Sequence, residues 1–518
     1  MTEAEQLTMA RRSKGGAVAS PHYLATLAGA RVLAEGGNAV DAAVAVNATL
    51  GVVAPYLCGF GGDVLAMVWD GEVHGYLGVG RAPEAGTIER VSSLIDAPVR
   101  TGAITVTPAG AFRGFFDLLD RWGTRSFGDL ATEAIRYGRD GVTLTPGAVQ
   151  RITNALAMHP QAGALHDQYA GPALGDRMVQ PELAALLELV AADGPDAFYS
   201  GPVAADIAEA VGAGGGLMTA DDLARHEGEW VDPLHAEFRG RTIWELPPPT
   251  QGITVLEVLR ILDDEVLEPG TARTHRMIEA MKLGLADRDA YVADPGSSPV
   301  QPSELLSDGW ISARRAQLDP SRATDPGPGV QQIGGTASIC VTDEDGLCIS
   351  LIQSNFLPFG SGVFVPKYGL SLQSRGASFR LSPTHPNSWA PGKLPLHTLV
   401  PALATSDGRP SLVFGTMGAD AQAQVHVQLL TRLFDDGASL RDALDTRRWR
   451  VEPGSWNVRT EDGASDVAAL EALGHVVEQV PAPDEGMGHA NLIALAGGGR
   501  LLDVATDARA EGLALIAT

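Results

Sequence analysis

The chain reads Gly334-Gly-Thr-Ala-Ser-Ile-Cys-Val-Thr-Asp-Glu-Asp-Gly346 at the point where loop-type sequence gives way to strand-type sequence. Thr336 follows two glycines and opens an apolar run that predicts a β-strand. A cut after Gly335 would make Thr336 a new N-terminus, which carries a hydroxyl nucleophile and its own base, the α-amine, on one residue. The stretch therefore predicts a chain that cuts itself and then uses Thr336 as its nucleophile.

The Gly-Thr step alone is weak evidence, because a glycine followed by threonine is usually a turn entering a strand. The same step occurs at 86–87, 123–124, 270–271 and 415–416. Only Thr336 has a second glycine before it and lies between a long loop and a hairpin. This context, rather than the dipeptide, favours Thr336 as the functional threonine.

The sequence around Thr336 predicts alternating helical and strand-rich regions. Residues 337–342 and 347–353 form β-type runs around the turn 343–346, which predicts a hairpin. Residues 295–333 are rich in Pro, Gly, Ser and Asp and predict a mobile loop. Ser20 and Pro21 predict the N-cap and first position of a helix. Further helices are expected at 38–50, within 110–225, and at 253–262, 274–291 and 421–434; further strands are expected at 64–69, 75–78, 412–414, 476–480 and 491–496.

Composition narrows the class of partner. At 518 residues the chain has room for two to four domains or one large layered α/β unit. A net charge of −25 argues against nucleic acid and anionic membranes as partners. Three cysteines make no disulfide framework, and no CxxC or HExxH motif is present, so we expect no metal and no cofactor. Residues 1–12 lack an apolar signal segment and no run is long enough to span a bilayer, which predicts a cytoplasmic protein.

Two competing types of site find little support in the sequence. Ser/His/Asp catalysis on an α/β-hydrolase fold needs a G-x-S-x-G turn, and none is present. The glycine stretches at 59–62 and 212–216 lack the strand–GxGxxG–helix context of a dinucleotide site. The threonine nucleophile remains the favoured interpretation.

Several motifs together resemble the γ-glutamyltransferase family. They occur in order along nearly the whole chain, at Gly15–Ser20, Glu35–Ala43, Gly59–Gly62, Leu246–Gly252, Glu279–Arg288, Thr336, Phe359–Gly362, Gly392–Lys393 and Gly415–Gly418. The resemblance implies an N-terminal-nucleophile hydrolase with an α/β fold, a four-layer αββα sandwich. It also implies a cut between Gly335 and Thr336.

The same resemblance implies the domain organisation and the partners. A large chain of 1–335 and a small chain of 336–518 would remain tightly paired in one intertwined αββα unit. The partner of this unit would be a small-molecule substrate. A homodimer of such pairs stays an open alternative.

The resemblance also implies the catalytic residues. Thr336 would attack an amide carbonyl while its α-amine shuttles the proton. Ser354 falls where the family places a hydroxyl that binds the nucleophile, although an ordinary serine at a strand end is the alternative. The backbone N–H groups of Gly418 and Ala419 fall at the oxyanion hole. Alanine stands where the family usually has a second glycine, and it keeps the N–H.

The substrate-binding positions depart from the family pattern. The family arginine falls on Val79, with Arg81 close by. The remaining replacements are Phe356 for an asparagine, Arg375 for a glutamine, Ser378 for the acidic residue that holds the α-ammonium, and His397 and Thr398 for paired serines. Exchanging a carboxylate for a cation disfavours an ammonium-bearing substrate. Glutathione is therefore not the expected substrate.

These replacements are similar to those of a subgroup that includes oxamate amidohydrolase. The motifs that carry this similarity are Gln353–Phe356, Ser374–Gly376, His385–Asn387, His397-Thr398 and Met417. Arg375 could bind a small substrate's carboxylate in a bidentate fork, and His397 and Thr398 could supply further polar contacts. The alternatives are a structural salt bridge for Arg375 and a buried, satisfied histidine for His397.

Other functions remain open within this resemblance. One is hydrolysis or transfer of γ-glutamyl groups through a rebuilt pocket. Another is an acylase or a carbon–carbon bond hydrolase in a biosynthetic pathway. A third, outside enzymology, is an unprocessed homologue that serves as a binding or scaffold protein.

Overall fold

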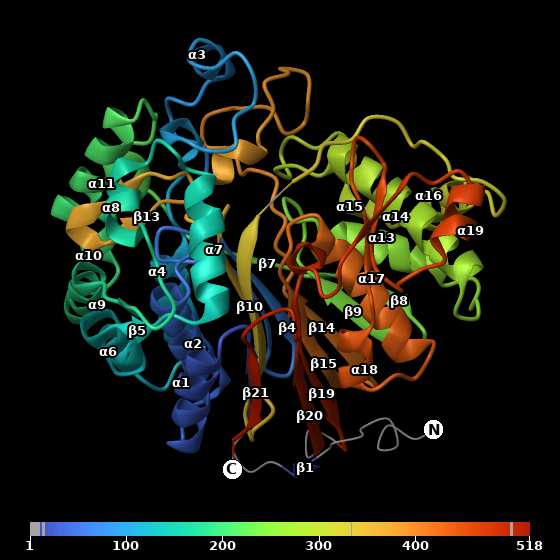
Figure 1. Ribbon diagram of the computed structural model, residues 1–518, viewed down its shortest axis with the longest axis horizontal. Helices are drawn as coiled ribbons and strands as arrows, with labels where there is room; N and C mark the ends of the chain where they lie inside the picture. The colour runs from blue at the N-terminus through green and yellow to red at the C-terminus, as the bar shows by residue number, and fades with distance from the viewer. Residues whose placement is uncertain (1–10, 13–15, 333, 498–500, 518) are drawn as a thin grey trace.

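Two seven-stranded antiparallel sheets face each other, and helices cover the outer face of each (Figure 1). The computed structural model describes residues 11–12, 16–332, 334–497 and 501–517. The first sheet contains, in order, β1 (Arg11–Arg12), β20 (Leu501–Thr506), β19 (Ala490–Ala496), β15 (Arg409–Thr416), β14 (Ala402–Ser406), β9 (Arg241–Glu245) and β8 (Leu234–Phe238). The second contains β21 (Leu513–Ile516), β2 (Ala17–Ser20), β10 (Gly335–Thr342), β11 (Cys348–Phe356), β3 (Asp63–Trp69), β4 (Val73–Gly78) and β7 (Glu229–Val231).

The layering follows from strands that are apolar on both faces. In β3, Leu65 and Met67 pack into the core between the sheets, whereas Val64, Ala66 and Val68 pack under the helices. Successive side chains of a strand point to opposite faces, so a continuous apolar run serves two cores at once. Together with the helical layers outside, this confirms the predicted four-layer αββα sandwich.

Different helices cover the two sheets (Figure 1). The second sheet packs against α2 (Ala39–Val53), which is buried along its whole length because α1 (Tyr23–Ala34) and further helices lie around it. Asn38 caps α2 in a reciprocal capping box with Asp41, which sets the first residue of the helix. The first sheet packs against α13 (Gly252–Leu262) and α17 (Ala421–Phe434), and α14 (Thr271–Tyr291) packs against α13.

Most of the remaining described helices lie within residues 110–225, as the alanine- and leucine-rich sequence there predicts. The remaining helices are α3 (Ile88–Ser92), α4 (Ala111–Trp122), α5 (Phe127–Leu130), α6 (Thr132–Asp140), α7 (Pro146–Ala157), α8 (Gly163–Tyr169), α9 (Pro181–Asp193), α10 (Asp196–Tyr199), α11 (Gly201–Ala213), α12 (Ala220–Ala224), α15 (Pro302–Leu305) and α16 (Asp308–Arg315), with α18 (Leu440–Asp445) and α19 (Val467–Ala472) near the C-terminus. No described helix combines the length and the apolarity needed to cross a bilayer.

Two local predictions were wrong. The first helix begins at Tyr23 with His22 as its N-cap, because Ser20 is still the last residue of β2. Residues 295–332 are not one loop, since α15 and α16 lie within them and Trp310 of α16 donates a hydrogen bond to buried Glu257. Residue 333 and most of the polar start predicted over 1–12 lie outside the described residues.

Strands from both sides of residue 335 contribute to each sheet. In the second sheet, β10 and β11 lie between β2 and β3. In the first sheet, β14 pairs with β9, which precedes residue 335 by about ninety positions in the chain. Each sheet is therefore complete only with strands from both the segment before residue 335 and the segment after it.

Candidate active site

Three neighbouring strands present Thr336, Ser354 and Asp63 side by side. Ser354 of β11 is the direct partner of Asp63 of β3. On the other edge of β11, Gly335 pairs with Phe356, and a shift in register falls between Gly335 and Ala337. Between these pairs β10 has one residue, Thr336, and β11 has two, so a bulge of β11 lies opposite Thr336.

The Ser354 hydroxyl joins the candidate nucleophile to the candidate scissile carbonyl. The Thr336 hydroxyl donates to Ser354 Oγ at 3.2 Å, and Ser354 Oγ donates to the carbonyl oxygen of Gly335 at 2.7 Å. The backbone N–H of Phe356 donates to the same Ser354 oxygen at 2.9 Å. One donated and two accepted bonds use the full capacity of a hydroxyl, so Ser354 has a fixed orientation.

Gly418 and Ala419 form a tight turn close to the residues before Thr336. Gly418 has φ 128° and Ala419 has φ 51°, so both adopt backbone conformations with positive φ. A Cβ atom on Gly334 would lie 3.6 Å from the Cβ of Ala419, which places this turn beside the Gly334–Gly335 segment. Alanine tolerates the left-handed region at a cost of about 1–2 kcal/mol. Ala419 therefore fits the turn, and its N–H is retained.

A buried cluster of charged and polar groups adjoins this row of strands. Asp63 Oδ1 accepts hydrogen bonds from the Gly80 N–H at 3.2 Å and from Gln373 Nε2 at 2.8 Å. Its Oδ2 accepts a hydrogen bond from His397 Nε2 at 3.1 Å and lies 3.4 Å from Arg375 Nε. Because Asp63 stands directly across from Ser354, these contacts bring Arg375 and His397 to the candidate active site.

Arg375 is the exceptional member of the cluster. Its side chain has no exposed surface, yet none of its three guanidinium nitrogens has a hydrogen-bond partner among the described residues. The guanidinium lies over the Phe356 ring, 4.6 Å from its centroid. Burial lowers the pKa of Arg375 to about 10, opposed by Asp63. An arginine that is buried, charged and free of hydrogen bonds is a ready receptor for an anion.

His397 is held in one tautomer. The Leu399 N–H donates to His397 Nδ1 at 3.3 Å, so the proton lies on Nε2, which donates to Asp63. Burial, together with the positive charge of Arg375, lowers the pKa of His397 from 6.5 to about 4. His397 is therefore neutral near pH 7 and acts as a hydrogen-bond donor to Asp63.

The neutral state of His397 predicts a pH-dependent loss of stability. Between pH 6.5 and about 4 the unfolded chain binds a proton at this position and the folded chain does not, so stability falls as the pH falls. The whole effect is at most about 3 kcal/mol. In His397→Gln, the free energy of unfolding should depend less on pH between pH 7 and 4.5 than in the wild type. Urea titration at each pH measures this dependence. An unchanged difference between the two proteins across this range would contradict the assignment.

Sequence reasoning did not find Asp63, the residue that connects the others. Its only signal was its place directly after the Gly59–Gly62 motif, at the start of a strand that is otherwise apolar. A buried aspartate at such a position needs several donors, which the sequence does not show because they come from Gly80, Gln373 and His397, far apart in the chain.

The other predicted substrate-binding residues differ in how they are connected to this cluster. Ser378 ends the short turn that begins at Arg375, and its buried hydroxyl has no partner among the described residues. Thr398 follows His397, and its carbonyl accepts a hydrogen bond from Gln251. Arg81 is about half exposed and pairs instead with Glu229 and the carbonyl of Gly392. No hydrogen bond or ion pair joins Arg81 to Thr336 or Arg375 within the described part of the chain, so its role in binding stays a prediction.

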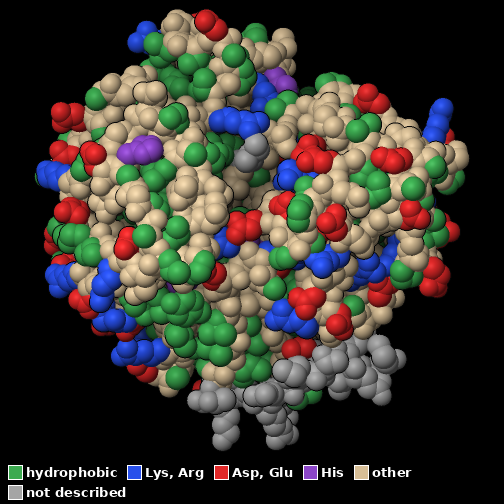
Figure 2. Space-filling view, in the orientation of Figure 1, with side chains coloured by type: hydrophobic (Ala, Val, Ile, Leu, Met, Phe, Trp, Pro, Cys, Tyr) green, Lys and Arg blue, Asp and Glu red, His purple; other side chains and the backbone are tan. Residues whose placement is uncertain are grey.

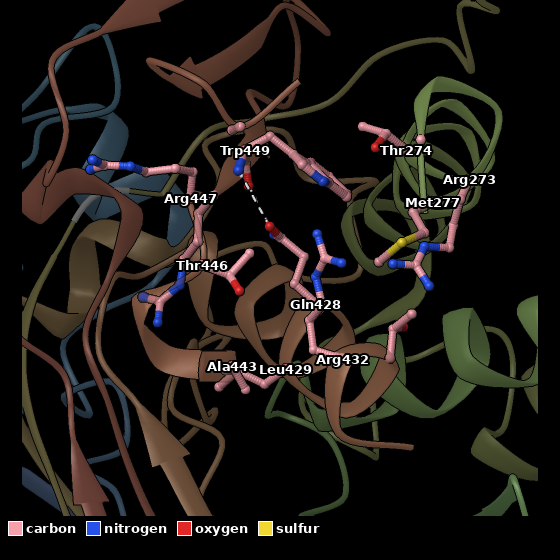
Figure 3. A pocket seen from close by; sticks show the side chains of 14 residues that line it. Arg273, Thr274, Met277, Gln428, Leu429, Arg432, Ala443, Thr446, Arg447 and Trp449 are labelled. Carbon is pink, nitrogen blue, oxygen red and sulfur yellow. Dashed lines mark hydrogen bonds between the residues drawn. The ribbon is translucent and has the colours of Figure 1, made fainter. Parts of the chain in front are cut away.

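The outer surface has a pocket that is separate from the Thr336 site. On the face shown in Figure 2, acidic and basic side chains are interspersed. Figure 3 shows a pocket between α14, α17 and residues 443–449. The arginines Arg273 and Arg432 line it, but both pair with Asp436. None of the predicted site residues lines this pocket, so it is separate from the Thr336 site.

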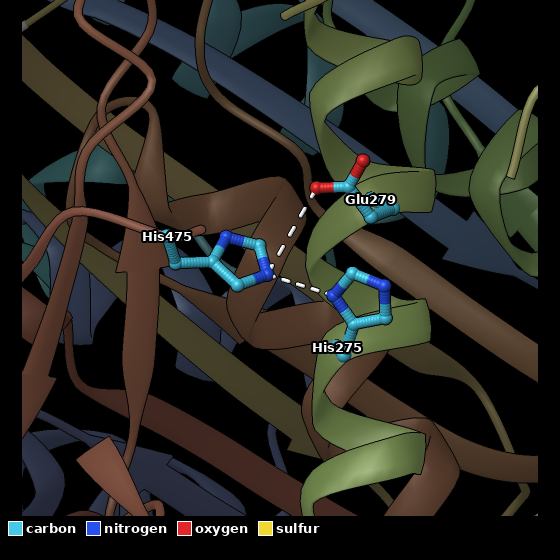
Figure 4. A group of neighbouring side chains, drawn as sticks. All are labelled: His275, Glu279 and His475. Atoms are coloured by element: carbon cyan, nitrogen blue, oxygen red, sulfur yellow. Dashed lines mark hydrogen bonds and ion pairs between the residues drawn. The ribbon is translucent and has the colours of Figure 1, made fainter. Parts of the chain in front are cut away.

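Three possible metal ligands, His275, Glu279 and His475, meet elsewhere, with ligand atoms within 4.8 Å of one another (Figure 4). His275 Nε2 donates to the Asp319 carbonyl at 2.8 Å, so its Nδ1 accepts from His475 Nε2 at 2.8 Å. The Lys282 ammonium lies 2.8 Å from Glu279 Oε1. The potential ligand atoms thus already have a hydrogen bond or an ion pair, and a cation would have to displace Lys282. We interpret the group as a polar cluster that ties α14 to the loop before β18 (Val477–Val480).

Comparisons with known proteins agree with this geometry. The family model described as gamma-glutamyltranspeptidase matches residues 25–517. The chain is 34% identical to an oxamate amidohydrolase proenzyme of Klebsiella pneumoniae, over 97% of this chain and 98% of that protein. It is 33% identical to a glutathione hydrolase-like YwrD proenzyme of Bacillus subtilis, over 96% and 98% of the two chains.

A solved structure supports the same assignment. A cephalosporin acylase from Bacillus halodurans superimposes with a TM-score of 0.92 at 33% identity, covering 98% of this chain and 96% of that one. The relatives share the N-terminal-nucleophile type of fold and carry the names of enzymes. The chain is therefore an enzyme of the N-terminal-nucleophile hydrolase type and belongs to the γ-glutamyltranspeptidase family.

Proposed function

We propose that the protein cuts itself between Gly335 and Thr336 and then hydrolyses a small amide that carries a carboxylate, such as oxamate, through an ester with Thr336. The observation that carries the proposal is Arg375, buried, without a hydrogen bond to its nitrogens, and 3.4 Å from Asp63, the strand partner of Ser354. The names of similar proteins support it at a coarser level, because they include an amidohydrolase and acylases, several of them proenzymes.

The contacts of Ser354 support the first step, the cut. The Thr336 hydroxyl oxygen would attack the Gly335 carbonyl carbon and displace the Thr336 nitrogen, which takes up a proton as the amine forms. Ser354 Oγ, 2.7 Å from the Gly335 oxygen, would donate to that oxygen as negative charge develops on it. Water would then hydrolyse the resulting ester and leave two chains, 1–335 and 336–518.

The freed amine supports the second step, turnover. It would accept the Thr336 hydroxyl proton as the oxygen attacks the substrate carbonyl, and would return a proton to the leaving ammonia. The N–H groups of Gly418 and Ala419 would stabilise the oxyanion of the tetrahedral intermediate. Water would attack the acyl-Thr336 ester and release the acid.

The cluster around Asp63 disfavours an amino-acid substrate such as a γ-glutamyl compound. Asp63 already receives hydrogen bonds from Gly80, Gln373 and His397, so it has little capacity left for a substrate ammonium. Ser378 stands where the family pattern has an acidic residue, and a hydroxyl cannot neutralise an ammonium group. Arg375, by contrast, has nitrogens available for the two oxygens of a carboxylate.

Two measurements on the purified full-length protein test the proposal. Intact mass under denaturing conditions should give two fragments whose boundary is Gly335–Thr336. The processed protein should release ammonia from oxamate with a kcat/KM at least about 100-fold above that for γ-glutamyl-p-nitroanilide, because the latter presents an ammonium group near Arg375. An uncut wild-type chain would refute the enzyme mechanism, and efficient hydrolysis of the anilide without hydrolysis of oxamate would refute the substrate class.

A further inference from the structure

A fully buried arginine, Arg288, lies at the centre of a second polar network beside the site. It is on α14, in the segment that precedes the proposed cut. Its Nη1 donates to Gln251 Oε1 at 2.9 Å and to Asp420 Oδ1. Its Nε and Nη2 donate to Asp289 Oδ1 at 3.0 and 2.8 Å. Every nitrogen of this guanidinium thus has a partner, in contrast to Arg375.

One side of the network holds the extended segment that precedes β10 and leads to the cut. The Val330 N–H donates to Asp289 Oδ2, and the Val330 carbonyl accepts from Arg288 Nη2 at 3.2 Å. The Gln332 N–H donates to Asp420 Oδ2. Asp289 and Asp420 therefore fix the backbone at two points, six and four residues before Thr336.

The other side of the network holds the turn that carries the candidate oxyanion donors. Gln251 Nε2 donates to the carbonyl of Ala419 at 2.9 Å and to that of Thr398 at 2.7 Å. Asp420 directly follows Ala419 and precedes α17, so its carboxylate is rigidly linked to the turn. Gln251 thus fixes the carbonyl of the peptide unit that follows Ala419, and Asp420 fixes the residue after it.

We infer that Asp420, held by Arg288, is a positioning residue for self-cleavage: it fixes the backbone before Gly335 and the Gly418–Ala419 turn relative to each other. The inference rests on the proposed cut at Gly335–Thr336. Among the described residues, Asp420 makes no hydrogen bond to Thr336 or to the scissile carbonyl. It acts through its two carboxylate oxygens, one bound to Arg288 and the other to the Gln332 N–H.

The charges in the network explain why Arg288 holds Asp420 and Asp289 in fixed positions. Burial raises the pKa of Asp420, and Arg288 opposes this effect. A charged arginine between two buried aspartates makes short, directional hydrogen bonds, and loss of one partner leaves the others unpaired. The nearby Arg380 adds a second positive charge that acts on both Asp289 and Asp420.

The test compares the rate of self-cleavage in variants of the full chain. Asp420→Asn keeps the size of the side chain but loses its charge. We expect it to slow the appearance of the two fragments by about 10-fold or more, since a hydrogen bond to a charged group contributes about that factor. Once processed, it should show a lower kcat with a nearly unchanged KM, because the oxyanion turn acts in the transition state. Gln251→Met keeps the size of the side chain and removes no charge, and it should also slow the cut and lower kcat, because the Ala419 carbonyl loses its donor.

Asp436→Asn is the matched control. Asp436 lies just beyond the other end of α17 and pairs with Arg273 and Arg432, two arginines that line the pocket of Figure 3. It should cut at the wild-type rate. If Asp420→Asn and Gln251→Met both cut at the wild-type rate per folded molecule and change only the melting temperature, the positioning role is refuted and the proposed function stands. An uncut wild-type chain would refute both.

Discussion

Thr336→Ala should leave the protein as one chain of 518 residues and abolish amide hydrolysis. The variant keeps the fold of β10 but lacks the only oxygen that donates to Ser354 from this position. Without that oxygen neither the cut nor the acyl-enzyme can form, so turnover should fall by at least about 1,000-fold, the scale seen when a nucleophile is removed. Intact mass after prolonged incubation and ammonia release from oxamate measure the two effects.

Two variants control for effects on the strand. Thr336→Ser keeps a hydroxyl at the same atom and should still be cut, at a lower rate. Thr342→Ala removes a buried hydroxyl at the other end of β10, where it lies 3.3 Å from Cys348 Sγ, and should be cut at the wild-type rate. A cut at 335/336 in Thr336→Ala would show that another group is the nucleophile.

The individual strands and helices could be predicted because their sequence patterns are local, whereas the four-layer arrangement was expected only from the family resemblance. Runs such as 64–69 and 491–496 are apolar on both faces, and the helix at 39–53 is apolar all round, which is what an inner sheet and a covered helix require. The exact start of the first helix was missed because Ser20 serves the strand before it. A local capping pattern cannot show that β2 continues to that residue.

The site was predicted only in part, and the reason is again physical. Thr336 could be singled out by its place between a loop and a hairpin, and Ser354 by the family resemblance. The role of Asp63 could not, because it depends on β3 lying beside β11 and on donors from 80, 373 and 397. Likewise, a sequence cannot show that Arg375 is buried without hydrogen bonds while Arg288 is buried with all of its donors used.

Arg375→Leu should remove the preference for a carboxylate. We expect kcat/KM for oxamate to fall by about 100-fold or more, because loss of one partner of a buried, hydrogen-bonded charge pair costs about 2–5 kcal/mol. Oxamide has the same shape, but an amide replaces its carboxylate, and its hydrolysis should change by no more than about threefold since it gains little from a cation. Arg375→Lys keeps the charge without the planar fork and should give an intermediate loss.

The ratio of the oxamate rate to the oxamide rate distinguishes a substrate-binding role of Arg375 from a purely structural role. Arg375→Leu alone leaves the buried Asp63 carboxylate without its nearby cation, which could disturb the whole cluster. The double variant Asp63→Asn/Arg375→Leu removes both charges and retains a neutral hydrogen-bonding side chain for His397. If Arg375 receives the substrate carboxylate, both variants lose the preference for oxamate over oxamide. The opposite result is that hydrolysis of oxamate and of oxamide falls equally in Arg375→Leu and that the double variant recovers both activities. Arg375 would then serve only as the partner of Asp63, and the proposed substrate class has to be abandoned.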